Sequence, residues 1–203
     1  MKIIIIGATG TIGSSVVKAM QAQHHVIQVG LTQGDYTMEI GDEQSILSTL
    51  DAIKSDHGKV DALISTTGKV KFAEFADLNA EDWQFGFNNK AMGQINLARH
   101  AKGYIVNGGS ITLTTGVLSD EHILKGASAA AVNGAIHSFV TAVAPVLENG
   151  LRINCVSPTV LEESMPVYAD FFPGFVPVPA KKVAQYYVRS VMGIGSGQIF
   201  KVS

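Results

Sequence analysis

The chain has 203 residues, of which 46% are hydrophobic and 16% are charged. This is the composition of a globular protein, and it excludes disordered, collagen-like and coiled-coil classes. The formal net charge is -2 and no basic run is longer than Lys181-Lys182, which disfavours nucleic acid and anionic membranes as main partners. The length predicts a single domain over residues 1–203.

The first residues bear on the expected location of the protein. Lys2 and the isoleucines of residues 3–6 resemble the start of a signal peptide, but Gly7 ends the apolar run too early for a signal sequence. No apolar run approaches the ~20 residues of a membrane span. The single cysteine, Cys155, excludes a disulfide framework and a cysteine-rich zinc site, and the scattered histidines predict no metal site. We therefore expect a cytoplasmic protein.

Short apolar segments alternate with longer amphipathic ones along the whole chain. The predicted strands are residues 3–6, 26–29, 36–40, 60–65, 110–115, 151–156 and 198–202. The predicted helices are residues 11–23, 45–57, 80–102, 127–147 and 181–192. This order predicts an α/β fold, in which a doubly wound parallel sheet of about seven strands has helices on both faces.

Two connections stand apart from this pattern. Only residues 30–35 separate the second and third predicted strands, whereas a parallel pair normally needs a crossover of about a dozen residues. Either a tight connection has replaced the helix there, or residues 36–40 are an extended edge segment. Residues 158–179 hold five of the six prolines together with Phe171, Phe172 and Phe175, which predicts a long apolar loop that covers a binding pocket.

A glycine-rich loop, GATGTIG at residues 7–13, lies between the first predicted strand and the first predicted helix. In this context Gly7 permits the tight turn, Gly10 lets the backbone approach a pyrophosphate, and Gly13 lets the helix pack closely on the sheet. The helix N-terminus adds free N–H donors and the positive end of its dipole. The loop therefore predicts a dinucleotide site, with a strand-to-helix turn that binds nothing as the alternative.

The three-and-three glycine spacing resembles that of extended and atypical members of the short-chain dehydrogenase/reductase superfamily. The turn at residues 65–68, STTG, keeps only the glycine of the family's Asn-Asn-Ala-Gly turn. Three further segments resemble the strand of the catalytic serine, the start of the active-site helix and the segment that holds the nicotinamide amide: GGSITLTTG (108–116), GASAAAVNGAIHSF (126–139) and RINCVSPT (152–159). The resemblance implies a compact but complete Rossmann-type fold, shortened after Val29 and at the end, Ser203.

The resemblance also implies a nicotinamide dinucleotide cofactor and assigns its contacts to these segments, with Glu39 and Ile40 near the adenine. The residues predicted to contact the cofactor, from the resemblance and from the reasoning on Thr32 and Lys90 below, are Gly7, Thr9, Gly10, Thr11, Ile12, Gly13, Thr32, Glu39, Ile40, Ser65, Thr66, Thr67, Gly68, Lys90, Pro158, Thr159 and Val160.

The choice between NAD and NADP rests on the residues after the second predicted strand. No acid follows that strand until Asp35, which disfavours selective recognition of the NAD ribose. No Lys or Arg lies between Lys18 and Lys54 to meet a 2′-phosphate, although Thr32 and Gln33 are able to hydrogen-bond one. We expect NADP, with NAD as the alternative.

The family's catalytic tetrad is absent at every aligned position. Its tyrosine, lysine, serine and asparagine fall on Lys125, Ala129, Gly116 and Lys90. We expect the ammonium missing at Ala129 to be replaced by Lys90 from the neighbouring helix, which would bind the nicotinamide ribose. Thr115 and Lys125 are then the candidate carbonyl polariser and proton donor. The alternative is that both lysines are solvated and that the pocket only binds nucleotide.

These residues predict an NAD(P)-dependent oxidoreductase of the short-chain dehydrogenase/reductase type. It would reduce a carbonyl or similar group of a small apolar substrate with a non-standard active site. The alternative is a catalytically silent NAD(P)-binding sensor or regulatory protein. The resemblance further implies a homodimer through the long predicted helices 80–102 and 127–147, which approach closely through small residues such as Gly134.

Overall fold

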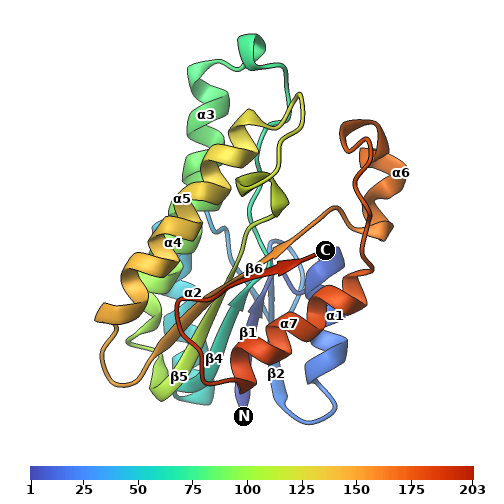
Figure 1. The fold of residues 1–203 in the computed structure, drawn as a ribbon. Helices are drawn as coiled ribbons and strands as arrows, with labels where there is room; N and C mark the ends of the chain where they lie inside the picture. Colours follow the sequence, from blue (N-terminus) through green and yellow to red (C-terminus); the bar gives the residue numbers. More distant parts are fainter.

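The computed structural model describes residues 1–203 and contains one seven-stranded sheet in the order β3-β2-β1-β4-β5-β6-β7 (Figure 1). All neighbouring strands are parallel. The strands are β1 (Lys2–Ile6), β2 (His25–Gly30), β3 (Tyr36–Thr37), β4 (Val60–Ser65), β5 (Ile105–Thr114), β6 (Arg152–Pro158) and β7 (Ile199–Val202). The predicted doubly wound sheet is confirmed. Its strand order reverses between β1 and β4, where such sheets bind ligands at their carboxyl ends.

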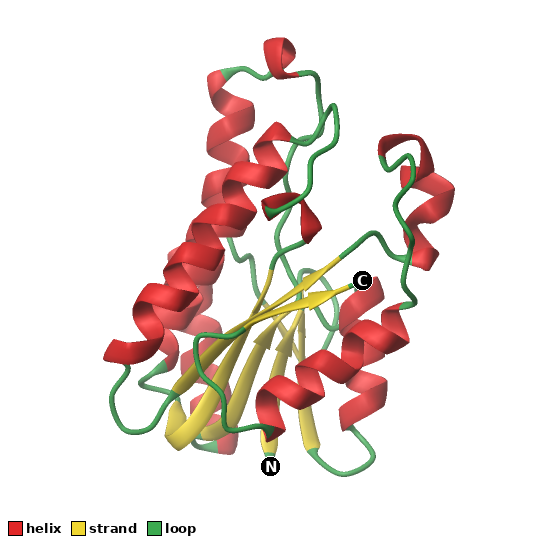
Figure 2. Cartoon of the chain, viewed as in Figure 1, coloured by secondary structure: helices red, strands yellow, loops and turns green.

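Helices cover both faces of the sheet (Figure 2). They are α1 (Thr11–Met20), α2 (Glu43–His57), α3 (Ala80–Gly86), α4 (Gly93–Ala101), α5 (Ala127–Val143), α6 (Met165–Tyr168) and α7 (Ala180–Met192). Helices α1 and α7 share one hydrophobic core with the sheet, while α2, α4 and α5 share the other. The first helix ends three residues earlier than predicted, because residues 21–23 form a turn.

Strand β1 divides its isoleucines between the two cores. Ile3 and Ile5 pack on the side of α1 and α7, whereas Ile4 and Ile6 pack on the side of α2, α4 and α5. All four are at most 2% exposed, and full burial of such a side chain contributes about 1.5–3 kcal/mol. A strand buried on both faces needs no polar alternation. The run that resembles a signal peptide is therefore a central strand of the sheet.

The connection between β2 and β3 is tight and contains no helix. Asp35 turns the chain back, since its N–H donates to the carbonyl of Gln28 and its Oδ2 accepts from the N–H of Gln28, both at 2.8 Å. Gly34 has φ +133, which a side chain would disfavour. The first of the two alternatives is confirmed, and the strand is shorter than predicted, because only Tyr36 and Thr37 pair with β2.

The prediction of a single helix over residues 80–102 is wrong, because the helix is interrupted in its middle. A π-helical segment, Phe87–Met92, separates α3 from α4. Gly93 then brings α4 against the segment that follows β3, where a Cβ atom at Gly93 would lie 2.7 Å from the carbonyl oxygen of Ile40. A wider π turn changes the direction of its side chains and is common at functional sites. Here it holds Asn89 and Lys90, which both line pockets at the carboxyl end of the sheet.

The predicted loop over residues 158–179 is partly ordered into short helices. Helix α6 lies between the 3-10 turns Glu162–Ser164 and Ala169–Phe171, and a bridge joins Leu161 to Val178. Phe172 is 8% exposed and packs with Leu118 and Val160. The segment stands over the carboxyl ends of the strands, as expected of a pocket cover (Figure 1).

The stretch Ala127–Val146 corrects one expectation from the sequence. It has 20 residues and a mean hydropathy of 1.4, so by length and composition alone it passes as a candidate membrane span. Only 28% of its apolar window is buried inside the chain. Its inner side chains, Val132, Ile136 and Val140, belong to the core beneath the sheet. Helix α5 ends at Val143, just before Pro145, as proline requires.

Candidate functional site

Two adjoining cavities lie at the carboxyl end of the sheet. The first, here the glycine-loop pocket, has a volume of about 290 Å³ and is lined by the turn after β1, the end of β2 and residues 38–40. The second, here the Lys90 pocket, has a volume of about 540 Å³ and is lined by Lys90, the ends of β5 and β6, and the segment with α6. Gly68 and Lys69 line both. The two cavities therefore form one site with two compartments.

The glycine loop has the geometry that its sequence predicts. Gly7 has φ +80, and a Cβ atom at Gly13 would lie 2.0 Å from the carbonyl oxygen of Gly7, so only glycine permits this approach of α1. A Cβ atom at Gly10 would meet nothing closer than 3.4 Å. No side chain caps the start of α1 beside Gly10. The open backbone and the free N–H groups of this helix start fit the pyrophosphate of a dinucleotide.

The structure gathers most of the predicted cofactor residues around these two cavities. The glycine-loop pocket is lined by Gly7, Thr9, Gly10, Glu39, Ile40, Thr66, Thr67 and Gly68, and the Lys90 pocket by Gly68, Lys90, Pro158, Thr159 and Val160.

The other predicted cofactor residues lie outside the two linings. Thr11, Ile12 and Gly13 form the start of α1. Ser65 is fully buried and bonds to Thr67 through its hydroxyl at 2.9 Å, so it supports the turn. Thr32 is exposed in the loop after β2 and lines neither cavity.

Two polar residues of the site escape the reasoning from sequence. Asn89 accepts a hydrogen bond from the N–H of Lys69 at 2.7 Å and donates to Glu39 Oε1 at 3.4 Å, so it joins three segments around the glycine-loop pocket. Lys69 is a cation at the border of both cavities. Its position directly after the recognised turn was a usable signal. Asn89 was hidden because the π turn that aims it interrupts a helical pattern.

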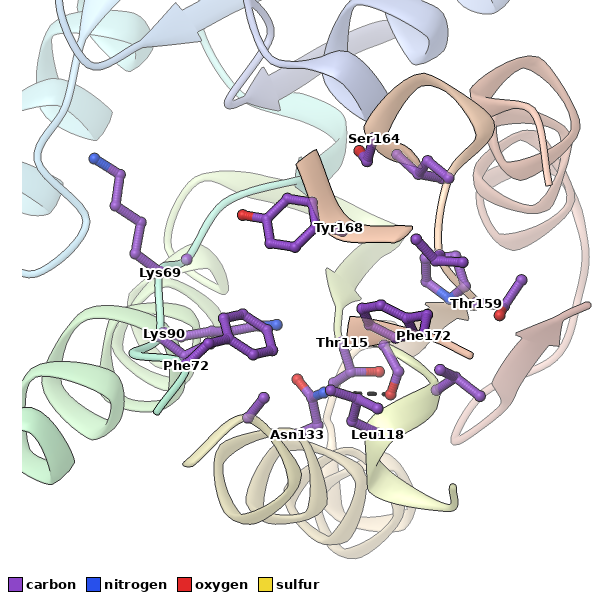
Figure 3. Close-up of a pocket in the computed structure, with 18 of the residues that line it drawn as sticks. Lys69, Phe72, Lys90, Thr115, Leu118, Asn133, Thr159, Ser164, Tyr168 and Phe172 are labelled. Atoms are coloured by element: carbon purple, nitrogen blue, oxygen red, sulfur yellow. Dashed lines mark hydrogen bonds between the residues drawn. The ribbon is translucent and has the colours of Figure 1, made fainter. Parts of the chain in front are cut away.

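The Lys90 pocket contains three of the four positions where the family's tetrad would stand. Lys90, Gly116 and Ala129 line it together with Thr115. Figure 3 shows Lys90 and Thr115 in this lining. Lys125 does not line this pocket, because it lines a separate cavity beside Phe171. Its Nζ lies 3.8 Å from Glu74 Oε1 and 5.8 Å from the centre of the Phe171 ring. The structure therefore brings together Lys90 and Thr115, and places Lys125 elsewhere.

The side chain of Lys90 reaches the cavity by passing over Gly68. A Cβ atom at Gly68 would lie 2.3 Å from Lys90 Cγ, so this glycine leaves room for the lysine stem. The ammonium points into the pocket (Figure 3). Burial lowers the pKa of Lys90 to about 8, against a smaller opposing effect of Cys155. Lys90 thus remains mostly charged at neutral pH and is able to lose its proton under mildly basic conditions.

Thr115 follows β5 and is held by three neighbours. Its N–H donates to the carbonyl of Val156 at 2.9 Å. Its hydroxyl lies 2.8 Å from His137 Nε2 and 3.2 Å from Cys155 Sγ. Burial raises the pKa of the Cys155 thiol to about 12, so this neighbour stays neutral.

Asn133 and His137, both on α5, were missed from the sequence. Asn133 donates to the carbonyl of Gly116 at 3.3 Å. The two residues lie four and eight positions after Ala129, on the same helix face, and this periodicity was a usable signal.

Apolar side chains form much of the remaining wall. Val70, Phe72, Leu118 and Phe172 line the Lys90 pocket, and Tyr168 adds a ring with a hydroxyl group. Of the three phenylalanines in the predicted loop over residues 158–179, only Phe172 lines this cavity. The other two, Phe171 and Phe175, line the separate cavity with Lys125. The main cavity suits a small, largely apolar molecule.

Comparisons with known proteins agree with this architecture. A family model described as enoyl-(acyl carrier protein) reductase matches residues 7–192. The crystal structure of the protein lin1944 from Listeria innocua is 41% identical, covers 100% of both chains and superposes with a TM-score of 0.95. A small-chain dehydrogenase is 25% identical over 100% of this chain and 96% of its own, with a TM-score of 0.84. A structure of a small-chain dehydrogenase in complex with NADPH, at 24% identity, shares the fold.

Curated relatives are more distant and longer. Versicolorin reductase 1 from Dothistroma septosporum is 26% identical over 140 residues, which are 67% of this chain and 53% of the relative. D-threitol dehydrogenase from Mycolicibacterium smegmatis is 26% identical over 139 residues. The chain thus spans about half the length of the curated relatives that it matches, at 53% and 50% of these two.

Proposed function

Because this chain belongs to the short-chain dehydrogenase/reductase superfamily, we propose that it is an NADP(H)-dependent oxidoreductase with a non-standard active site. Its substrate is a small apolar molecule with a carbonyl or similar group. The observation that carries the proposal is the ammonium of Lys90, which enters the pocket whose family lysine is replaced by Ala129. An ammonium at this place can form charge-assisted hydrogen bonds with ribose hydroxyls, which an apolar wall cannot form.

Both compartments of the site would be needed to hold the cofactor. The start of α1 and Gly10 would hold its pyrophosphate, and the glycine-loop pocket would hold the adenosine beside Glu39. When bound, a reduced nicotinamide supplies a hydride. NADP is preferred because Asp35, the first acid after β2, lines neither cavity of the site and bonds through Oδ2 to the backbone N–H of Gln28. Lys69 adds a positive charge at the border of the pocket.

The residues of the Lys90 pocket divide the remaining tasks. Lys90 binds the nicotinamide ribose, and the hydroxyl of Thr115 donates to the carbonyl oxygen of the substrate. The rings of Phe72 and Phe172 exclude water and contact the apolar part of the substrate. Lys125 has no direct part, because its ion pair with Glu74 lies outside this cavity.

A fluorescence titration with NADPH and NADH, followed by NADPH oxidation with a panel of small aldehydes and ketones, tests the proposal. We expect tighter binding of NADPH and turnover of at least one apolar carbonyl compound. Lys90→Ala should weaken binding and turnover, while the control Lys125→Ala should leave both unchanged. Absence of nucleotide binding, or equal activity of Lys90→Ala and wild type, would contradict the proposal.

A catalytically silent NAD(P)-binding sensor is the second candidate. It is favoured by Gly116 and Ala129, which leave the pocket without two of the family's reacting side chains. In this case NADPH would bind tightly and no carbonyl compound of the panel would be reduced. The carbonyl panel therefore separates the two candidates after one binding measurement.

The proposal includes a homodimer in the cytoplasm. Small and partly exposed residues, among them Ala130, Ala131 and Gly134, form the outer face of α5. A Cβ atom at Gly134 would have no neighbour within 4 Å, so this face is open to a second helix pair. Sedimentation equilibrium should give a mass twice that of one chain for the wild type, and the mass of a single chain for Gly134→Glu.

A further inference from the structure

The hydroxyl of Thr115 has a titratable neighbour that the mechanism so far leaves unused. His137 Nε2 lies 2.8 Å from Thr115 Oγ1, within hydrogen-bond distance. Thr115 lines the Lys90 pocket, whereas the His137 side chain lies outside the lining and is partly exposed on α5. The pair therefore connects the interior of the pocket with the surface of the protein.

The direction of this hydrogen bond decides what Thr115 is able to do. A threonine hydroxyl has one proton and can accept two hydrogen bonds. If the ring nitrogen of His137 accepts the proton of Thr115, that proton is not free for a substrate. If Nε2 carries a proton and donates it to Oγ1, the proton of Thr115 is free to point into the pocket. An imidazolium always donates from Nε2.

Burial and three charged groups from separate elements set the charge of His137. Burial lowers its pKa, Asp120 raises it, and Lys201 and Lys90 lower it. Asp120 follows the 3-10 turn Val117–Ser119 and is paired with Lys201 of β7 at 2.7 Å. Thr115 is the side chain that is hydrogen-bonded to the His137 ring. Cys155, the second side chain in contact with the Thr115 hydroxyl, stays a neutral thiol because burial raises the pKa of Cys155 to about 12.

We propose that His137 is a positioning residue that passes a proton through Thr115 to the substrate. This inference rests on the proposed function, because it needs a carbonyl compound in the Lys90 pocket. The carbonyl carbon accepts a hydride from the reduced nicotinamide, and the π pair of the carbonyl moves onto oxygen. That oxygen takes the proton of Thr115 as a new O–H bond forms. Oγ1 takes the Nε2 proton of the imidazolium, and the neutral His137 regains a proton from water.

The first test needs neither substrate nor cofactor. The ¹⁵N resonances of His137 are followed against pH in the free protein, with His137→Gln used to assign them. A hydrogen bond from the imidazolium to Thr115 stabilises the charged form, so Thr115→Val should lower the midpoint of His137 by about 0.5 pH unit or more. Thr115→Ser, which keeps the hydroxyl, should retain the wild-type midpoint. An unchanged midpoint in Thr115→Val would overturn the proposal.

The second test is the pH profile of carbonyl reduction. In the wild type, kcat should fall as pH rises through the midpoint of His137 measured by NMR. His137→Gln keeps an N–H donor and cannot titrate, so its profile should lose this step while NADPH affinity stays within about twofold of wild type. Retention of the step in His137→Gln would overturn the proposal. Failure of NADPH to bind would instead overturn the proposed function, and the NMR coupling would still decide the relation between His137 and Thr115.

Discussion

Replacement of Lys90 by methionine gives the sharpest test of its role as the cofactor-binding ammonium. Methionine keeps most of the length of the stem, which packs over Gly68, and removes the charge. A hydrogen bond to a charged group contributes about 1.5–3 kcal/mol, and ~1.4 kcal/mol corresponds to a factor of ten in affinity. Lys90→Met should therefore weaken NADPH binding by about 10-fold to 100-fold.

The pH dependence of binding follows from the lowered pKa of Lys90. With a pKa of about 8, the side chain is about nine-tenths charged at pH 7 and about one-tenth charged at pH 9. If only the ammonium binds the ribose, the Kd of the wild type for NADPH should rise about tenfold between these two pH values. Lys90→Met should show no such rise. Fluorescence titration at a series of pH values measures both constants.

The same substitution should stabilise the protein without ligand. The burial that lowers the pKa of Lys90 from 10.5 to about 8 costs at most about 3–4 kcal/mol. Because the side chain is only partly buried and lines a cavity, we expect a gain of about 1–2 kcal/mol in Lys90→Met. This cost applies in full below pH ~8, where the lysine is charged in both the folded and the unfolded state. It disappears between pH ~8 and ~10.5, as the lysine becomes neutral first in the folded and then in the unfolded state. The gain should disappear over the same range.

Lys125→Met is the matched control for these measurements. Lys125 has a side chain that is 44% exposed and lies outside the Lys90 pocket. The Lys125→Met variant should bind NADPH with the wild-type Kd at every pH. A Kd for Lys90→Met within twofold of wild type, or a pH-independent Kd in the wild type, would refute the assignment of Lys90.

Three further predictions concern other parts of the fold. Gly13→Ala should lower the Tm or unfold the chain, because the added Cβ atom would lie 2.0 Å from a backbone oxygen. Gly10→Ala should keep the wild-type Tm and weaken NADPH binding, and equal Tm values of the two variants would contradict this prediction. Cys155 should resist alkylation at pH 8 until the protein unfolds, since burial raises its pKa to about 12, and mass spectrometry of the native protein measures this. Tyr187→Phe should cost about 1 kcal/mol in urea unfolding, because its buried hydroxyl lies 2.6 Å from that of Thr114; a neutral result would show that this contact is dispensable.

The sheet and the glycine loop were predictable because their signals are local. Four consecutive isoleucines beside Gly7 indicate a strand that is buried on both faces, and the structure places it at the centre of the sheet. The missing crossover was also visible, as a gap too short for a helix. The tight connection is held by two hydrogen bonds between Asp35 and Gln28. These bonds form only when the chain reverses its direction, and a pattern of hydrophobic residues does not indicate such a reversal.

The site was only partly predictable, because its polar contacts join distant segments. The aligned position of Lys90 predicted its place at the pocket, but nothing in the sequence indicated the π turn that separates α3 from α4. Lys125 was assigned from the same alignment, and the structure places it with Glu74 instead. The contact between Thr115 and His137 spans 22 residues and two elements, so it appears only once α5 is packed beside the end of β5.

A crystal structure of the chain with bound NADPH would reveal whether Lys90 binds the nicotinamide ribose. We predict that the nicotinamide lies in the Lys90 pocket, with Lys90 Nζ within about 3.2 Å of a hydroxyl of its ribose. We also predict the pyrophosphate at the start of α1. A nicotinamide outside this pocket, or a Lys90 side chain turned away from the ribose, would contradict this prediction.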